Sequence, residues 1–298
     1  MKSYKEFIRE SEVLSKTDKD FIHSKLYHRI IYHGISNNYT INPDGSIDVD
    51  GEFDNNVSFD PSRSSSTKLR YKPSKKNKLT ELPIKFNKVG GYFYCNNNEL
   101  TTLEGSPKEV GGDFKCNENK LTSLEGGPVS VGGNFICRNN QLTSLQGAPK
   151  RVGGDFKCND NELTTLEGAP KEVGGDFYCS RNELTSLVGC PEIIHGNFYC
   201  RENQITDFRG VPEFFEGLFY CEENPIEEIY RLFIQEDKHI TDFSLLYGLD
   251  GLSKCIKWIN EFDVIQGNRV IMDRLEEVFY QLGMDVPENI ELPSYEII

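Results

Sequence analysis

Residues 110–128 read VGGDFKCNENKLTSLEGGP, and nearly the same stretch begins again at Val131, Val152 and Val173. The repeated unit first appears at Val89 and becomes less regular after residue 193. Its period is constant and is marked by evenly spaced cysteines at positions 95, 116, 137, 158, 179, 200 and 221. A fixed period of this length is typical of a solenoid, whose short units bury their apolar faces only against one another.

Within each unit, the residue pattern separates inward from outward positions. Phe114 and Cys116 stand two apart, so on a strand they point to one face, which we expect to be the core. An asparagine, here Asn119, follows each cysteine by three residues. A buried amide must be satisfied, so we expect it to bond the backbone of its own turn and of the next unit. Leu121 and Leu124 then extend the core.

The cysteines have a structural interpretation. Seven of the nine occupy one inward phase of the repeat, leaving Cys190 and Cys255, and no Cys-x-x-Cys pair occurs. We therefore expect reduced thiols that act as small apolar side chains, with no disulfide framework, metal site or cofactor.

The composition limits the class of protein. Of its 298 residues, 37% are hydrophobic. No apolar run approaches the length of about 18 residues that a membrane span requires, so we expect neither a span nor a secretory signal. A formal charge of -14 argues against general binding to nucleic acid or anionic membranes, because neutralising phosphate requires a basic surface.

The segment 61–78 departs from this acidic composition, with seven basic residues and no acidic one. It is also rich in serine and poor in apolar residues. We expect a mobile loop there; the alternative is contact with an acidic partner or nucleic acid.

Other reactive groups do not form a recognisable site. Asp44, Asp48 and Asp50 lack the spacing and the glutamate of a calcium loop, so we interpret them as turn acids. No phosphate-binding loop, nucleophile elbow or zinc signature occurs. An enzyme with its site near Trp258 and Asp263 is an alternative for which the sequence indicates no reaction type.

The outward strand positions are the main candidates for function. One residue per unit lies between the inward Phe and Cys, and these residues form a column: Tyr94, Lys115, Ile136, Lys157, Tyr178, Tyr199 and Tyr220. A second column, two residues further on, contains Arg138 and Arg201. Solenoid strand faces are common binding surfaces, and Tyr and Arg are enriched at protein interfaces. We predict that this face binds a partner; the alternative is that tyrosine is present only because it favours strands.

After Pro225 the apolar spacing becomes helical. Ile226, Ile229 and Phe233 mark one stripe, and a second runs over residues 270–282 and ends at Gly283. We interpret Trp258 in this region as a core residue.

The pattern Phe-x-Cys-x-x-Asn-x-Leu-x-x-Leu resembles leucine-rich repeats, with Phe and Cys in place of the first two leucines. The chain is similar to uncharacterised leucine-rich-repeat proteins of large T-even-type tailed phages, which share an opening segment like Tyr39–Gly51, an alternating hairpin about an Asp-Gly turn. Its opening segment, MKSYKEFIRE, resembles the capsid-targeting peptide of internal head proteins of such phages. That resemblance implies cleavage after Glu10, with Ile8 two residues earlier, and a place in the phage head interior.

The predicted fold is a mainly β solenoid of short, leucine-rich-repeat-like units with α-helical caps at both ends. The predicted segments are 1–36 (helical, with 1–10 as the cleavable peptide), 37–60 (opening hairpin and cap), 61–78 (basic loop), 79–233 (repeats) and 234–298 (helical cap). The predicted function is that of a non-catalytic protein-interaction module of phage origin. It would bind a host or phage protein, either after packaging in the head or as an early inhibitor or adaptor against host defence in the host cytoplasm.

Overall fold

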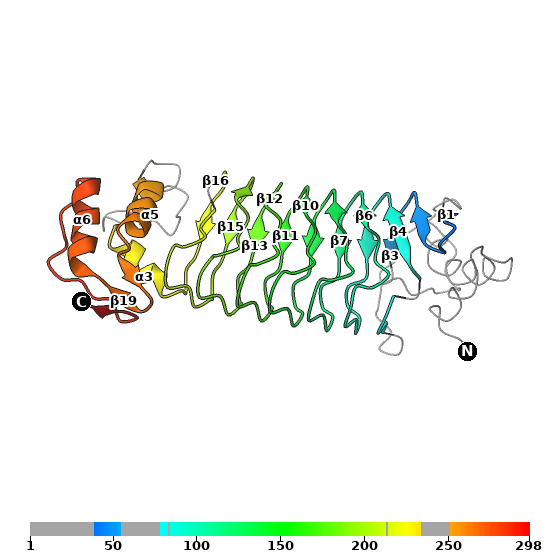
Figure 1. Cartoon of the computed structure of the whole chain (residues 1–298), viewed down its shortest axis with the longest axis horizontal. Coiled ribbons are helices and arrows are strands. Elements are labelled where there is room, and N and C mark those ends of the chain that lie inside the picture. Colours follow the sequence, from blue (N-terminus) through cyan, green and yellow to red (C-terminus); the bar gives the residue numbers. More distant parts are fainter. Residues whose placement is uncertain (1–38, 55–77, 83, 213, 234–250) are drawn as a thin grey trace, which may run out of the picture. The chain divides into compact units, whose positions relative to one another are not determined.

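The computed structural model describes residues 39–54, 78–82, 84–212, 214–233 and 251–298 (Figure 1). The predicted N-terminal helices, the cleavage residues Ile8 and Glu10, and the basic segment up to residue 77 lie outside the described residues. Two compact units divide the chain, residues 1–142 with 146–157 and residues 143–145 with 158–298. We call them unit 1 and unit 2.

Each 21-residue repeat forms one coil of a β-solenoid, as predicted, and each coil carries two short strands (Figure 1). In unit 1 the first sheet contains β1 (Tyr39–Ile41), β2 (Ile47–Val49), β4 (Phe86–Val89), β6 (Glu109–Val110), β8 (Ser130–Val131) and β10 (Arg151–Val152). The second sheet contains β3 (Phe53–Asp54), β5 (Phe93–Tyr94), β7 (Phe114–Lys115), β9 (Phe135–Ile136) and β11 (Phe156–Lys157). Successive coils pair in parallel, and β1 pairs with β2 antiparallel, which confirms the predicted hairpin.

Unit 2 continues the same two-strand coil and adds a mixed C-terminal part. Its coil strands are β12 (Glu172–Val173), β14 (Ile193–Ile194) and β16 (Phe214–Phe215) in one sheet, and β13 (Phe177–Tyr178), β15 (Phe198–Tyr199) and β17 (Phe219–Tyr220) in the other. After them come α3 (Ile226–Arg231), α5 (Gly251–Glu261), β18 (Ile265–Gln266), β19 (Arg269–Val270), α6 (Met272–Leu282) and β20 (Glu296–Ile297).

The strands of the first sheet, such as β6, were not predicted. They are very short, and most of them directly precede a pair of glycines. Those glycines join the two strands of a coil, and the backbones of neighbouring coils come close together there. A Cβ on Gly111 would lie 2.0 Å from the carbonyl oxygen of Gly90, and one on Gly132 would lie 2.2 Å from that of Gly111. In these coils the backbones approach so closely at the first glycine that a Cβ would force them apart, whereas the equivalent position holds His195 and Glu216 in the last coils of unit 2.

The predicted core is confirmed. The Phe, Cys and two Leu of the central repeats are fully buried, as at Phe114, Cys116, Leu121 and Leu124. The phenylalanines of unit 1 stack, with 5.3 Å between the ring centroids of Phe93 and Phe114. All cysteines are free. Burial raises the pKa of the evenly spaced thiols, such as that of Cys116, well above the ordinary value. A thiol held in its neutral form is a small apolar group, as expected.

The asparagine of each repeat bonds backbone groups of two coils. The Asn119 Nδ2 donates to Cys116 O (2.9 Å) in its own coil and to Cys95 O (3.1 Å) in the preceding one. Its Oδ1 accepts the N–H of Leu100, also in the preceding coil, at 3.0 Å. The prediction of a bond to the following unit is therefore wrong in direction, because these bonds run to the preceding coil.

The first coil begins earlier than the repeat pattern indicates. The N–H of Glu99 donates to Leu79 O at 2.9 Å. These two residues are separated in sequence by close to one repeat. Phe53, however, is the register partner of Phe93, an offset close to two repeats. The first coil therefore runs from Ile47 and contains an insertion between Phe53 and Leu79. Strands β2 and β3 of the predicted 37–60 cap therefore pair with β4 and β5 in the same parallel manner as the strands of successive coils.

The C-terminal part is only partly helical. Helix α6 ends at Gly283, whose φ of 68° is the left-handed cap conformation that the sequence predicts. Val270 belongs to strand β19, not to that helix, and β18, β19 and β20 form a small sheet that was not predicted. The Tyr295 hydroxyl donates to Thr206 O (2.8 Å), joining this part to a coil of unit 2.

Candidate protein-interaction surface

Three tyrosines of the predicted column stack on one another in unit 2. The ring centroids of Tyr178 and Tyr199 are 4.3 Å apart, and those of Tyr199 and Tyr220 are 4.6 Å apart, with interplanar angles of 5° and 2°. The parallel pairing of β13, β15 and β17 sets this spacing, because register partners one coil apart lie about 4.8 Å from each other. We call Tyr178, Tyr199 and Tyr220 the tyrosine ladder. Each residue of the ladder is half-buried.

An arginine borders the tyrosine ladder. The Arg201 guanidinium carbon lies 4.7 Å from the ring centroid of Tyr220. Its Nε and a terminal nitrogen donate to the two carboxylate oxygens of Glu222 at 2.6 and 2.8 Å. This forked pair fixes the orientation of the guanidinium, and its hydrogen bonds to Glu222 raise the pKa of Arg201 above its ordinary value.

A third outward column was missed by the sequence analysis. It contains the residue just before the inward Phe, which from Phe114 to Phe198 is always an acid or an amide: Asp113, Asn134, Asp155, Asp176 and Asn197. The Asp176 Oδ1 accepts the N–H of Asn197 in the next coil (2.7 Å), and its Oδ2 accepts the Tyr178 hydroxyl (2.7 Å). The alternation that predicts an inward Phe also predicts this outward neighbour, so the sequence contained the necessary signal.

Burial and nearby charge affect the central tyrosine. Burial raises the pKa of the Tyr199 phenol above its ordinary value, and the negative charge of Asp176 raises it further. Both effects disfavour the phenolate, so Tyr199 stays neutral and can donate its proton in a hydrogen bond.

In unit 1 two members of the same column, Lys115 and Lys157, are charged. Lys115 Nζ lies 4.2 Å from the ring centroid of Tyr94 and 3.6 Å from Asp113 Oδ2. Lys157 lies 3.1 Å from Asp155 in the same manner. Ile136 is half-buried between these coils, and Arg138 lies 3.8 Å from Glu118. The predicted residues are therefore brought together as a mixed column with two Lys–Asp pairs in unit 1 and as an aromatic ladder in unit 2.

Other predicted candidates are tied to structural contacts. The Asp44 carboxylate accepts the N–H and hydroxyl of Ser46 at 3.0 and 2.6 Å, and these bonds lower its pKa to about 2. Asp44 is therefore a turn acid, as interpreted.

Trp258 is half-buried and stacks on Phe262, so its prediction as a core residue holds only in part. Asp263 binds Arg274, with 3.1 Å between carboxylate and guanidinium.

No protein-family model, curated protein or solved structure matches the chain. Within the described ranges, no three His, Cys, Asp or Glu side chains are grouped so that they could hold a metal ion. Helices in the part of the chain that the structure describes are all too short or too polar to cross a membrane.

Proposed function

We propose that the protein is a non-catalytic binding module that captures a protein partner through the tyrosine ladder and Arg201. The observation that carries this proposal is the ladder itself, three stacked tyrosines at outward positions with spacings of 4.3 and 4.6 Å. Tyr and Arg are the residue types that most often anchor protein interfaces. Because stacking already orders these side chains, less conformational entropy is lost when a partner binds.

The stacking also favours a protein over a flat ring as the ligand. Both ring faces of Tyr199, and one face each of Tyr178 and Tyr220, lie against a neighbouring tyrosine, so most of the ring-face area is not available to stack on a sugar or a nucleobase. Ring edges and hydroxyls remain, and these groups form apolar contacts and hydrogen bonds with a protein surface.

The test is a triple substitution, Tyr178→Ala with Tyr199→Ala and Tyr220→Ala. We expect cooperative unfolding to persist, because these side chains lie outside the core, while capture of the partner from infected-cell lysate is lost. The captured protein is identified by mass spectrometry, and its affinity for the wild-type chain is then measured with purified components.

A matched control changes exposed residues of the same coils on another side, Glu183→Ala with Thr185→Ala and Gln204→Ala. This control should bind the partner like the wild-type chain. Equal binding by the tyrosine variant would exclude the ladder as the binding surface.

We also propose that the coils are short leucine-rich-repeat variants and that the C-terminal part caps the solenoid. The inward Phe, Cys and Leu positions and the asparagine bonds support the first idea. The bonds from Tyr295 to Thr206 and from Asn260 to Phe208 support the second. Deleting residues 251–298 should then expose the apolar end of the last coil and cause aggregation, measured by light scattering.

For the biological context, we propose a phage origin with packaging in the head, on the resemblance of residues 1–10 to capsid-targeting peptides. Mass spectrometry of purified virions should detect a peptide that begins at Ser11. Its absence, with the chain found only in infected cytoplasm, would favour the alternative of an early inhibitor or adaptor against host defence.

A further inference from the structure

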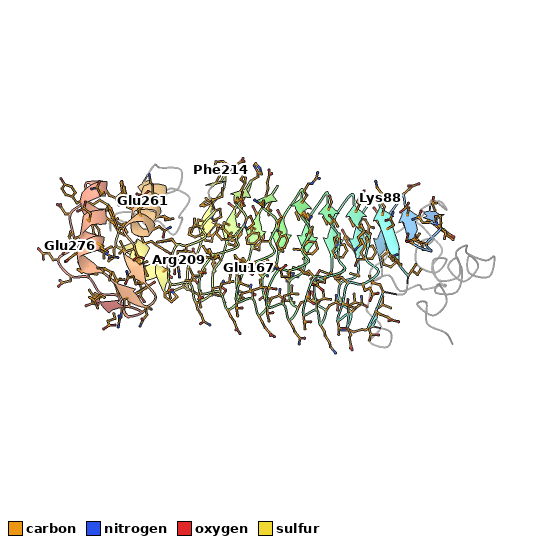
Figure 2. The ribbon with its side chains drawn as sticks, viewed as in Figure 1. Lys88, Glu167, Arg209, Phe214, Glu261 and Glu276 are labelled. Atoms are coloured by element: carbon orange, nitrogen blue, oxygen red, sulfur yellow. The ribbon has the colours of Figure 1, made fainter. Side chains whose placement is uncertain are left out.

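In unit 2 the outward side chains of β12, β14 and β16 change from polar to apolar toward β16, the last strand of that sheet. The outward position just before the inward Val or Ile is polar in the other coils, where it holds Lys88, Glu109, Ser130, Arg151 and Glu172. In β14 and β16 it holds Ile193 and Phe214, which are register partners. Phe214 is 50% exposed and lies on the outer side of the strands (Figure 2). Because the other coils fold with polar residues here, the solenoid does not require this apolar pair.

A second departure from the repeat occurs beside the first. Two residues after Ile193 and Phe214, where the preceding coils have a glycine, stand His195 and Glu216. The His195 Nδ1 lies 2.9 Å from a Glu216 carboxylate oxygen, and its Nε2 lies 2.8 Å from one of Glu172. The imidazole thus bridges carboxylates from the two flanking coils.

The charge around the apolar pair is negative. Glu172, Glu192 and Glu216 supply three carboxylates, and Lys171, 2.9 Å from Glu192, supplies one ammonium group. These groups carry a net charge of about minus two when the imidazole is neutral and about minus one when it is protonated, so the surface is acidic in both states. A cation brought by a partner can take the place of the imidazole between Glu172 and Glu216.

We propose that these residues, the acidic patch of Ile193, Phe214, His195, Glu172 and Glu216, dock a protein segment that presents an apolar side chain beside lysine or arginine. The apolar side chain covers Phe214, and the cation pairs with the two carboxylates. This surface lies on a different sheet from the tyrosine ladder, so the proposal does not depend on the function proposed for that ladder.

The probe is a synthetic peptide of alternating lysine and apolar residues, Lys-Leu-Lys-Val-Lys, added to the full-length chain. We expect binding by calorimetry, with amide chemical-shift changes confined to residues 171–173, 192–197 and 214–217. Two control peptides separate the contributions, one with Glu replacing Lys and one with Ser replacing Leu and Val. Both should bind at least about tenfold more weakly, the change that loss of one good contact produces.

Substitutions then locate the site. Phe214→Ser restores the polar type found at Ser130 and should weaken the peptide about tenfold. Glu216→Gln alters only an exposed side chain and should weaken it without affecting the fold. Arg151→Ser, at the equivalent position of another coil, and the triple tyrosine variant should leave the affinity unchanged.

Three results would overturn the proposal. Equal affinity of the peptide for the wild-type chain and for both the Phe214→Ser and Glu216→Gln variants would exclude the patch. Shifts centred elsewhere would assign the peptide to another surface. Self-association without peptide in sedimentation, abolished by Phe214→Ser, would assign the patch to a second copy of the chain.

Discussion

The amide of Asn182 forms bonds on both sides of one coil boundary. Its Nδ2 donates to Cys158 O and Cys179 O at 3.2 and 2.9 Å, and its Oδ1 accepts the N–H of Leu163 at 3.0 Å. Cys158 O also accepts Asn161 Nδ2 (3.0 Å) and Cys179 O also accepts Asn203 Nδ2 (3.1 Å), so the Leu163 N–H is the group that depends on Asn182.

Asn182→Ala should destabilise the protein by about 2 kcal/mol, because it leaves the buried Leu163 N–H without a partner and removes one donor from each of two carbonyls. Urea unfolding followed by circular dichroism measures the change. Gln204→Ala, an exposed residue of the same unit, is the control and should cost less than about 0.5 kcal/mol. Equal effects of the two substitutions would show that the asparagine bonds do not stabilise the coils.

His195 permits a second prediction at this scale. Its hydrogen bonds to Glu216 and then to Glu172 raise the pKa of the imidazole above its ordinary value. The charged bridge is therefore complete at acidic pH, and its stabilisation is lost as pH rises through the raised pKa. The effect on stability should be small, because the side chain is exposed to solvent and screened.

Nuclear magnetic resonance titration of the His195 ring should give a midpoint above about 6.5, the value of an unperturbed histidine. Glu216→Gln should lower that midpoint, whereas Glu183→Gln, a change on another side of a neighbouring coil, should not. A midpoint at or below the unperturbed value would contradict the bridge.

At the scale of the element, the coils that have glycine first in the corner between their two strands pack closely there, whereas His195 and Glu216 stand at that position in the last coils of unit 2. Gly132→Ala would place a Cβ 2.2 Å from Gly111 O, which the stacked backbone cannot accommodate without moving a whole coil. We expect a loss of about 3 kcal/mol in the free energy of unfolding, the upper range for an overpacked site.

Gly267→Ala is the matched control, because the Cβ there meets nothing within 4 Å and only the positive φ of 66° opposes it. It should cost about 1 kcal/mol. Thermal unfolding of both variants distinguishes close packing from backbone strain. A Gly132→Ala variant as stable as Gly267→Ala would mean that the coils are more widely spaced at this corner.

At the scale of the whole molecule, the repeat predicts which deletions are tolerated. Removing residues 110–130 deletes one complete coil and joins Glu109 to Val131, so every inward position stays inward. Cooperative urea unfolding should persist, with an m-value reduced roughly in proportion to the surface that is lost.

The control deletion removes residues 110–129 and leaves Ser130 in place. It shifts the strand register by one residue, and a one-residue slip turns inward side chains such as Phe135 toward solvent. This variant should lose the cooperative transition. Equal stability of the two deletions would show that strand register does not hold the coils together.

The sequence indicated the solenoid, its period and its inward residues, because each coil repeats one local arrangement and makes most of its contacts with the adjacent coils. Phe114, Cys116 and Asn119 could be assigned in this way. The tyrosine column was also predictable, since alternation along a strand fixes the face of every residue. The acid and amide column at Asp176 was predictable by the same rule but was overlooked.

Only the tertiary structure decided features that depend on contacts outside the repeat. It placed the start of the first coil at Ile47, because strand pairing links segments that the insertion separates in sequence. It also assigned Val270 to a strand, since β20 from the end of the chain pairs with β19 there.

The sequence by itself therefore determined the fold of the repeats and the identity of their outward columns. The tertiary structure decided that Tyr178, Tyr199 and Tyr220 stack while Lys115 and Lys157 pair with aspartates. It also placed His195 between Glu172 and Glu216. The physical reason is that periodicity fixes the direction of a side chain, whereas its partners depend on distances between coils that only the folded chain sets.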